Sequence, residues 1–278
     1  MSVNRLIEVE FRPQNSQAII LNGLKIGFDV LKTSDPKANE TTLNIWNLSK
    51  TTYDRTAIVD TDVIIRAGYE DEGGLIAIAY GKVISSKRKI ERPEIIHEYT
   101  ILDGQKESRD AYVSVSYKRG TTSSTIIRNL IEFIGLPIAL GSDIPQQEYT
   151  SGYSFVGLAV DALGEVLARL SYTFTIQNQE IYIFKEGDFI NAQAEVISPE
   201  TGMIDSPVAL TDAQDSGNAP SDKQKYSVRS LLKPRILPNT QISIQSSVAS
   251  GFFIAQTVHH VGDNWEGDFT TDMEVISV

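Results

Sequence analysis

The stretch Leu24-Lys25-Ile26-Gly27-Phe28-Asp29-Val30 decides the fold class, because apolar side chains occupy every second position. Successive side chains of a β-strand point to opposite faces of a sheet, so this spacing predicts a strand with one buried face. Further strands are predicted at residues 6–11, 42–48, 63–67, 81–90 and 95–102. Asn22-Gly23 suits a tight hairpin, and Ser49 suits the N-cap of a short helix to about Ile58. Six short strands with one small helix predict a closed or nearly closed barrel.

The middle of the chain changes to helical spacing. Apolar residues recur on one face of a predicted helix: Ile126, Ile127, Leu130, Ile131 and Ile134. Gly135 and Pro137 should stop this helix. A second helix is expected over about 157–170, followed by a hairpin of strands 171–177 and 180–185. These elements predict a small α/β module with an aliphatic core.

The last third begins with a long polar loop near 206–224 and then returns to β patterning. Strands are expected at 226–232, 241–246, 252–261 and 268–278. The chain is therefore predicted to be α+β and mainly β. Its expected domains are an N-terminal β-barrel over 1–104, the α/β module over 105–190 and a C-terminal β-barrel over 191–278.

Composition excludes several kinds of protein. With 41% hydrophobic and 22% charged residues among 278, the chain has the balance of a soluble globular protein. No apolar run reaches the ~20 residues of a membrane helix, and residues 1–11 lack the apolar stretch of a signal peptide, so we expect a protein made without export. Cysteine is absent, which removes thiol nucleophiles and thiolate metal sites. We expect no cofactor and no bound metal.

The acidic charge is concentrated at the C-terminal end. The formal net charge is −11, and residues 191–278 contribute −6 of it. No Lys or Arg follows Arg235, whereas the segment after it contains five carboxylates: Asp263, Glu266, Asp268, Asp272 and Glu274. Nucleic-acid binders carry basic stripes, so this balance argues against tight binding of nucleic acid. The acidic residues predict either a solvated edge or a surface that repels an anion.

No motif predicts catalysis. Gly152-Tyr153-Ser154-Phe155-Val156 lacks the last glycine of a nucleophile elbow, which favours a turn or cap role for Ser154. The neighbours His259 and His260 should point to opposite faces of a strand, which disfavours a shared metal. A carboxylate pair for glycoside hydrolysis stays open, because its separation is spatial.

One basic cluster stands out, at Lys87, Arg88 and Lys89. These side chains are either solvated strand residues or contacts to an acidic neighbouring subunit.

Several segments together resemble the tail and baseplate hub proteins of bacteriophages. Glu-Thr-Thr-Leu-Asn-Ile-Trp-Asn-Leu-Ser at 40–49 and Val-Ile-Ile-Arg-Ala-Gly-Tyr at 63–69 resemble the start of that family. Later segments follow it in order, at 153–170, 198–207, 228–239, 251–253 and 260–269. The resemblance covers nearly the whole chain. It departs at Asn239, where the family usually has Gly, although Asn also tolerates a positive φ.

The resemblance implies a structural function. Such hubs are similar to the core of the type VI secretion spike. Three copies, each with two tube-like barrels, form a ring that joins a sixfold tail tube to a threefold spike around the DNA channel. Expected partners are a tail tube protein, a central spike protein, a tape measure protein and baseplate wedge proteins. The implied location is the baseplate of a contractile tail assembled in the host cytoplasm, with a part in DNA ejection.

Within that picture, Asp263, Asp268, Asp272 and Glu274 could line the channel, so that DNA passes without being bound. Lys87, Arg88 and Lys89 would contact a neighbouring subunit, and no membrane insertion is expected.

Two other functions remain open from the sequence. One is a cell-wall hydrolase carried on the tail. The other is a carbohydrate-binding tail accessory that stacks sugars on Trp46 or Trp265.

Overall fold

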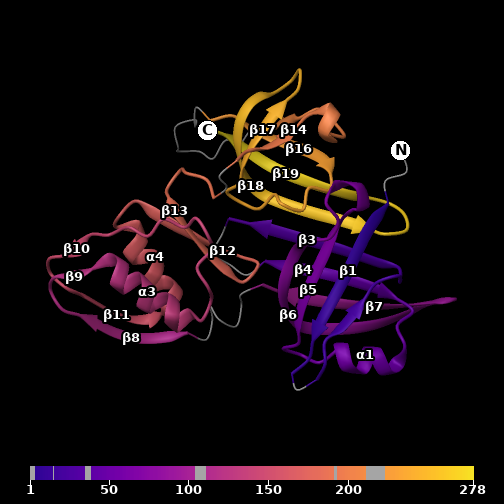
Figure 1. Cartoon of the computed structure of the whole chain (residues 1–278), viewed down its shortest axis with the longest axis horizontal. Coiled ribbons are helices and arrows are strands. Elements are labelled where there is room, and N and C mark those ends of the chain that lie inside the picture. The colour runs from indigo at the N-terminus through magenta and orange to yellow at the C-terminus, as the bar shows by residue number, and fades with distance from the viewer. Residues whose placement is uncertain (1–3, 15, 35–38, 104–110, 191–192, 211–222) are drawn as a thin grey trace, which may run out of the picture. The chain divides into compact units, whose positions relative to one another are not determined.

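The computed structural model describes residues 4–14, 16–34, 39–103, 111–190, 193–210 and 223–278. They group into two compact units. Unit 1 holds the N-terminal and C-terminal β regions, and unit 2 holds the middle of the chain (Figure 1). The prediction of a mainly β, α+β fold is confirmed. The division into three separate domains stays a prediction.

The N-terminal β region of unit 1 contains seven strands and two short helices. Its elements are β1 (Arg5–Arg12), β2 (Ile19–Leu21), β3 (Ile26–Thr33), β4 (Glu40–Trp46), α1 (Lys50–Thr56), β5 (Asp62–Tyr69), η1 (Glu70–Glu72), β6 (Ile76–Glu91) and β7 (Glu94–Leu102). Each of the six predicted strands is present. Ser49 caps α1 as predicted, because its side chain accepts a hydrogen bond from the Thr52 N–H.

The C-terminal β region completes unit 1. It contains β14 (Glu195–Ile197), η2 (Pro199–Thr201), β15 (Val208–Leu210), β16 (Lys225–Leu231), β17 (Gln241–Gln245), β18 (Ser250–Asp263) and β19 (Phe269–Ser277). Asn239 has a φ of +64°, so it takes the turn conformation expected of it. The predicted loop 206–224 falls largely outside the described residues.

The two β regions share one sheet of thirteen strands. Its main path runs β15-β16-β19-β18-β3-β4-β7-β6-β5-β1-β2, and β14 and β17 branch from it. The seam is an antiparallel ladder between β18 and β3 that extends from Thr257↔Thr33 to Asp263↔Gly27. The predicted Asn22-Gly23 hairpin is wrong, because β3 uses its two edges for β18 and β4, so that β2 pairs with β1.

Unit 2 is the α/β module. It contains β8 (Tyr112–Tyr117), β9 (Thr121–Thr122), α3 (Ser123–Ile134), β10 (Glu148–Tyr149), β11 (Tyr153–Leu158), α4 (Ala159–Ala168), β12 (Tyr172–Gln177) and β13 (Glu180–Lys185). The aliphatic stripes of α3 and α4 are buried in one cluster, as their spacing predicted. Gly135 ends α3 with a φ of +79°, which only glycine adopts without cost.

Unit 1 has two apolar cores. The first is built by the strands of the N-terminal region, but it also includes Leu232 and Phe269 from the C-terminal region. The second lies within the C-terminal region, around Ile242, Ile244 and Val258. Two residues contributed across the seam therefore bury apolar surface that would otherwise face water on both regions.

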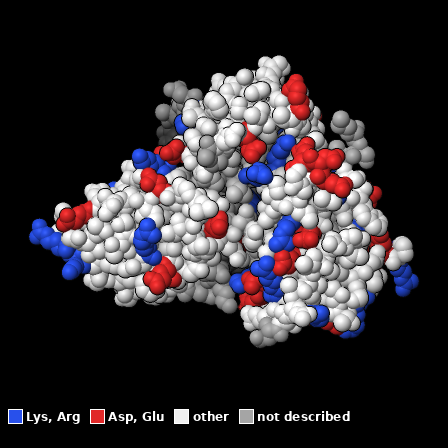
Figure 2. Space-filling model, in the orientation of Figure 1, with Lys and Arg blue, Asp and Glu red and all other residues white. Residues whose placement is uncertain are grey.

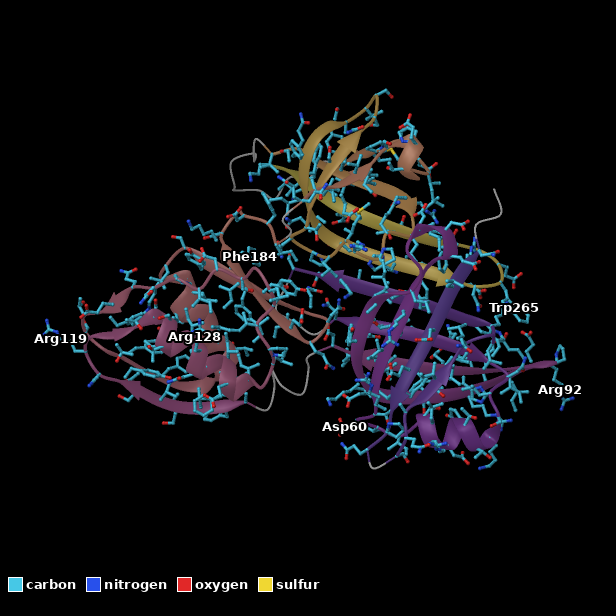
Figure 3. All side chains as sticks on the ribbon, viewed as in Figure 1. Asp60, Arg92, Arg119, Arg128, Phe184 and Trp265 are labelled. Atoms are coloured by element: carbon cyan, nitrogen blue, oxygen red, sulfur yellow. The ribbon has the colours of Figure 1, made fainter. Side chains whose placement is uncertain are left out.

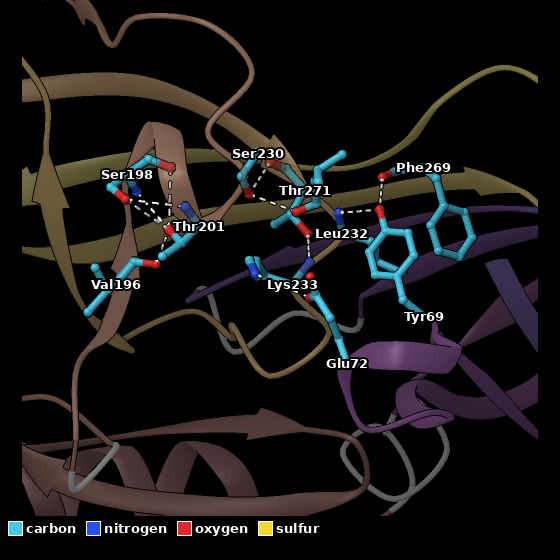
Figure 4. A network of polar contacts seen from close by, with 11 residues as sticks. Tyr69, Glu72, Val196, Ser198, Thr201, Ser230, Leu232, Lys233, Phe269 and Thr271 are labelled. Carbon is cyan, nitrogen blue, oxygen red and sulfur yellow. Dashed lines mark hydrogen bonds and ion pairs between the residues drawn. The ribbon is translucent and has the colours of Figure 1, made fainter. Parts of the chain in front are cut away.

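Polar contacts of the Tyr69 hydroxyl tie the two regions together (Figure 4). It donates a hydrogen bond to the Phe269 carbonyl at 3.0 Å and accepts one from the Leu232 N–H at 3.3 Å. The Tyr69 and Phe269 rings also meet edge to face, with centroids 5.2 Å apart. Burial raises the pKa of Tyr69 above its ordinary value, so the hydroxyl keeps its proton and can donate.

We predict that Tyr69→Phe destabilises unit 1 by about 1–3 kcal/mol, because it leaves a buried N–H and a buried carbonyl without their partner. Urea unfolding monitored by circular dichroism measures the change. Tyr80→Phe is the matched control, since the half-buried Tyr80 hydroxyl bonds none of the described residues. Equal free energies of unfolding for both variants would contradict the role of Tyr69.

Candidate functional site

The acidic residues predicted at the C-terminal end lie on the outer face and turn of β18 and β19. Asp272 and Glu274 alternate with the buried Met273 and Val275 of β19. Asp263 ends β18, and Asp268 lies between the two strands. The structure thus gathers all four residues on one hairpin.

Cations of the same unit compensate part of this charge. Arg229 of β16 pairs with Asp268 at 3.0 Å and with Asp272 at 3.3 Å. Lys25 Nζ lies 4.0 Å from Asp263 and also bonds Glu266, and that bond holds the pKa of Glu266 below its usual range. Glu274 is exposed and pairs with no cation among the described residues. Glu274 is therefore the member whose charge is least compensated.

The basic cluster is divided between two faces of β6. Lys87 and Lys89 flank Glu98 of β7, at 3.7 and 2.5 Å. The hydrogen bond from Lys89 is the main cause of a lowered pKa at Glu98. Arg88 faces the other side, opposite His97. The contact of these three residues with a neighbouring subunit stays a prediction.

The sheet face that carries these residues is polar and of mixed sign. Arg229, Asp272 and His259 are neighbours across β16, β19 and β18. His259 Nε2 continues this row to Asp29 of β3, at 2.7 Å. Figure 2 shows the same mixture of Lys and Arg beside Asp and Glu on the face that it draws. No single-sign field covers this face, so sequence charge alone overstates its acidity.

The two adjacent histidines behave differently, as strand alternation predicted. His259 is partly exposed, whereas His260 is fully buried, with Nδ1 2.9 Å from Thr271 Oγ1. Thr271 Oγ1 also accepts the Lys233 N–H at 2.8 Å, which places His260 beside the network around Tyr69. The sequence carried no signal for this link, because it depends on which strands pair.

Residues considered for catalysis are not assembled into a reactive group. Ser154 lies within β11, and its hydroxyl bonds that of Ser116 across the ribbon. Among the described residues, no three His, Asp or Glu side chains are placed to hold a metal ion. In the same part of the chain, no helix is both long and apolar enough to cross a membrane.

The two tryptophans differ in exposure. The Lys25 ammonium lies 4.8 Å from the Trp46 ring centroid, so a cation covers that ring. Trp265 is 67% exposed.

Comparison with solved structures supports a shared fold over almost the entire chain. A tail protein of prophage MuSo2 from Shewanella oneidensis superimposes with a TM-score of 0.64 at 8% identity, over 97% of this chain and 98% of that one. A tail protein from Neisseria meningitidis MC58 gives 0.62 at 9% identity, over 98% and 96%.

A type VI secretion component from E. coli gives a TM-score of 0.60 at 11% identity, over 97% of this chain and 76% of that one. That component is described as structurally similar to the T4 tail proteins gp27 and gp5. No protein-family model and no curated protein matches the sequence. The expected resemblance to phage tail proteins is thus confirmed at the level of the fold.

We predict that buried His260 makes the stability of unit 1 depend on pH. Burial, and to a lesser degree the charge of Lys32, lower its pKa from 6.5 to about 3. Below pH 6.5 the unfolded chain binds a proton that the folded chain does not, so the free energy of unfolding falls as the pH falls from 6.5 toward 3. The slope is at most about 1.4 kcal/mol per pH unit.

Urea titrations between pH 4.5 and 7 should show a smaller slope for His260→Gln than for the wild type. His259→Gln, on the exposed face of the same strand, is the control. An unchanged slope in His260→Gln would show that other groups cause the dependence.

Proposed function

We propose that this chain is a structural hub protein of a phage tail. The observation that carries the proposal is the match of its fold, along nearly the whole of both chains, to two phage tail proteins. The likeness of the E. coli secretion component to gp27 and gp5 points to a place near a spike. Partners would then be a tail tube protein on one side and a spike protein on the other.

The arrangement of unit 1 fits a ring of three copies. Each copy has two β regions, each with its own core, in one continuous sheet. Three copies would present six such regions around an axis, which matches a sixfold tube, while the chain itself repeats three times, which matches a threefold spike. A closed ring has no unpaired interface, and closure is the common arrangement of oligomers.

In this proposal the outer face of β18 and β19 lines part of the channel. A polar face of paired charges would not hold DNA, because it offers few free cations to neutralise phosphates. Glu274, exposed and without a cation, would add repulsion over roughly a Debye length of ~8 Å.

A cell-wall hydrolase is the competing function. Incubation of the purified chain with peptidoglycan separates the two, since cleavage of the glycan or peptide by this chain alone would argue for an enzyme.

We predict that the full chain assembles into a threefold ring. Native mass spectrometry of concentrated protein, together with electron microscopy of the ring and of tails, measures the number of copies. Single copies in assembled tails would contradict the proposal.

We predict that Glu274→Lys raises the retention of DNA by the assembled protein at low salt by at least severalfold, because the change converts a repelling charge into one that binds phosphate. Glu132→Lys on the exposed side of α3 is the control with the same change in net charge. Filter binding of duplex DNA over a salt series measures the difference. Equal retention by both variants would place Glu274 away from the DNA path.

A further inference from the structure

The turn between β18 and β19 presents Trp265 to solvent. Its side chain is 67% exposed, and Figure 3 shows it projecting from the ribbon at that turn. Asp263 Oδ1 accepts hydrogen bonds from the N–H groups of Trp265 at 2.7 Å and of Glu266 at 3.1 Å. The Asp263 side chain thus fixes the backbone on both sides of the indole.

Two more side chains fix the rest of this turn. Asn264 accepts the Ile26 N–H and donates to the Leu24 carbonyl, at 2.9 and 2.7 Å. Arg5 donates to the carbonyls of Asp263 and Gly267, both at 2.9 Å. The backbone that carries Trp265 is therefore ordered before any partner arrives, so binding through this side chain would cost little additional entropy.

Such a side chain is typical of a protein interface. Tryptophan is enriched among the residues that contribute most to binding, where it fills a pocket of the partner. A sugar site is less suitable, because a sugar needs hydrogen bonds beside the ring. The nearest polar side chains, those of Asp263 and Asn264, are already used within the turn.

Unit 1 also contains a cavity that suits an indole. It has a volume of about 130 Å³, and Tyr69, Ile76, Leu232 and Pro234 contribute to its lining. Apolar cavities of about 150 Å³ are large enough to bind benzene. The cavity lies where the two β regions meet, beside the Tyr69 hydroxyl (Figure 4).

The edge of this cavity is charged. Lys233 lies 3.5 Å from Glu72, and both line the cavity with Glu195 and Arg235. Arg235 is exposed and pairs with no carboxylate among the described residues. On the other surface, Trp265 is followed by Glu266, whose side chain is 75% exposed, and by Asp268, at 62%. The free cation beside the cavity therefore complements the two carboxylates beside the indole.

We infer that Trp265 of one copy enters the cavity beside Tyr69 of a second copy, with Arg235 of the second copy facing Glu266 and Asp268 of the first. This inference rests on the proposed ring. The contact joins two different surfaces, so it leads from each copy to the next, and a ring forms when the third copy meets the first.

Disulfide cross-linking tests the contact directly, because the chain has no cysteine of its own. Glu266→Cys places a thiol beside the indole, and Glu72→Cys places one at the cavity, where the side chain is 52% exposed. Oxidation of a mixture of the two variants should give covalent dimers. The chain with both substitutions should give covalent species up to three copies.

Matched controls separate this contact from random collision. Ile58→Cys, at a position 54% exposed, should give no dimer with Glu266→Cys. Adding Trp265→Ala to the Glu266→Cys chain should reduce cross-linking at least tenfold, whereas Trp265→Phe should retain most of it. Because Trp265 is largely exposed, its removal should leave the circular dichroism spectrum unchanged.

The outcomes distinguish the inference from the proposed function. A threefold ring in the wild type without the cross-link between Glu266→Cys and Glu72→Cys would overturn the inference and keep the ring. A cross-link that is indifferent to Trp265→Ala would also overturn it. Covalent chains longer than three copies would confirm the contact but contradict the closed ring.

Discussion

The buried hydroxyl of Tyr69 is the contact on which unit 1 depends most. It joins the end of β5 to the Phe269 carbonyl and the Leu232 N–H, whose side chains belong to the first core although they come from the C-terminal region. Without that link, the backbone ladder of β18 and β3 would still connect the two regions, but two buried polar groups would lose their partner. The cavity beside Tyr69 exists because Leu232 and Pro234 approach β5 at this point.

Local structure was readily predictable from the sequence, and its assembly was not. The alternation at 24–30 predicted β3, and the stripe from Ile126 to Ile134 predicted α3, because both signals come from residues close in the chain. The pairing of β3 with β18 joins residues more than two hundred positions apart, and the strand pattern of either partner is satisfied by any suitable neighbour. Asn22-Gly23 shows the same limit: the turn is local, but the choice of β1 as the partner of β2 is not.

The candidate surfaces follow the same division. Sequence identified Asp263, Asp268, Asp272 and Glu274 as an acidic group, and they do lie on one hairpin. It could not show that Arg229 reaches two of them, because that contact depends on the register of β16 against β19. Nor could it distinguish Trp265 from Trp46, since only the tertiary structure places Lys25 over one ring and leaves the other exposed.

Strand β18 has a mechanical consequence for a protein in a tail. Its first half pairs with β17 over the second core, and its second half pairs with β3 over the first core. A pull that separates the two β regions along this strand would load the ladder hydrogen bonds in shear, where many bonds resist together. Force would thus pass through backbone within a single sheet, and the joint would behave as a stiff strut.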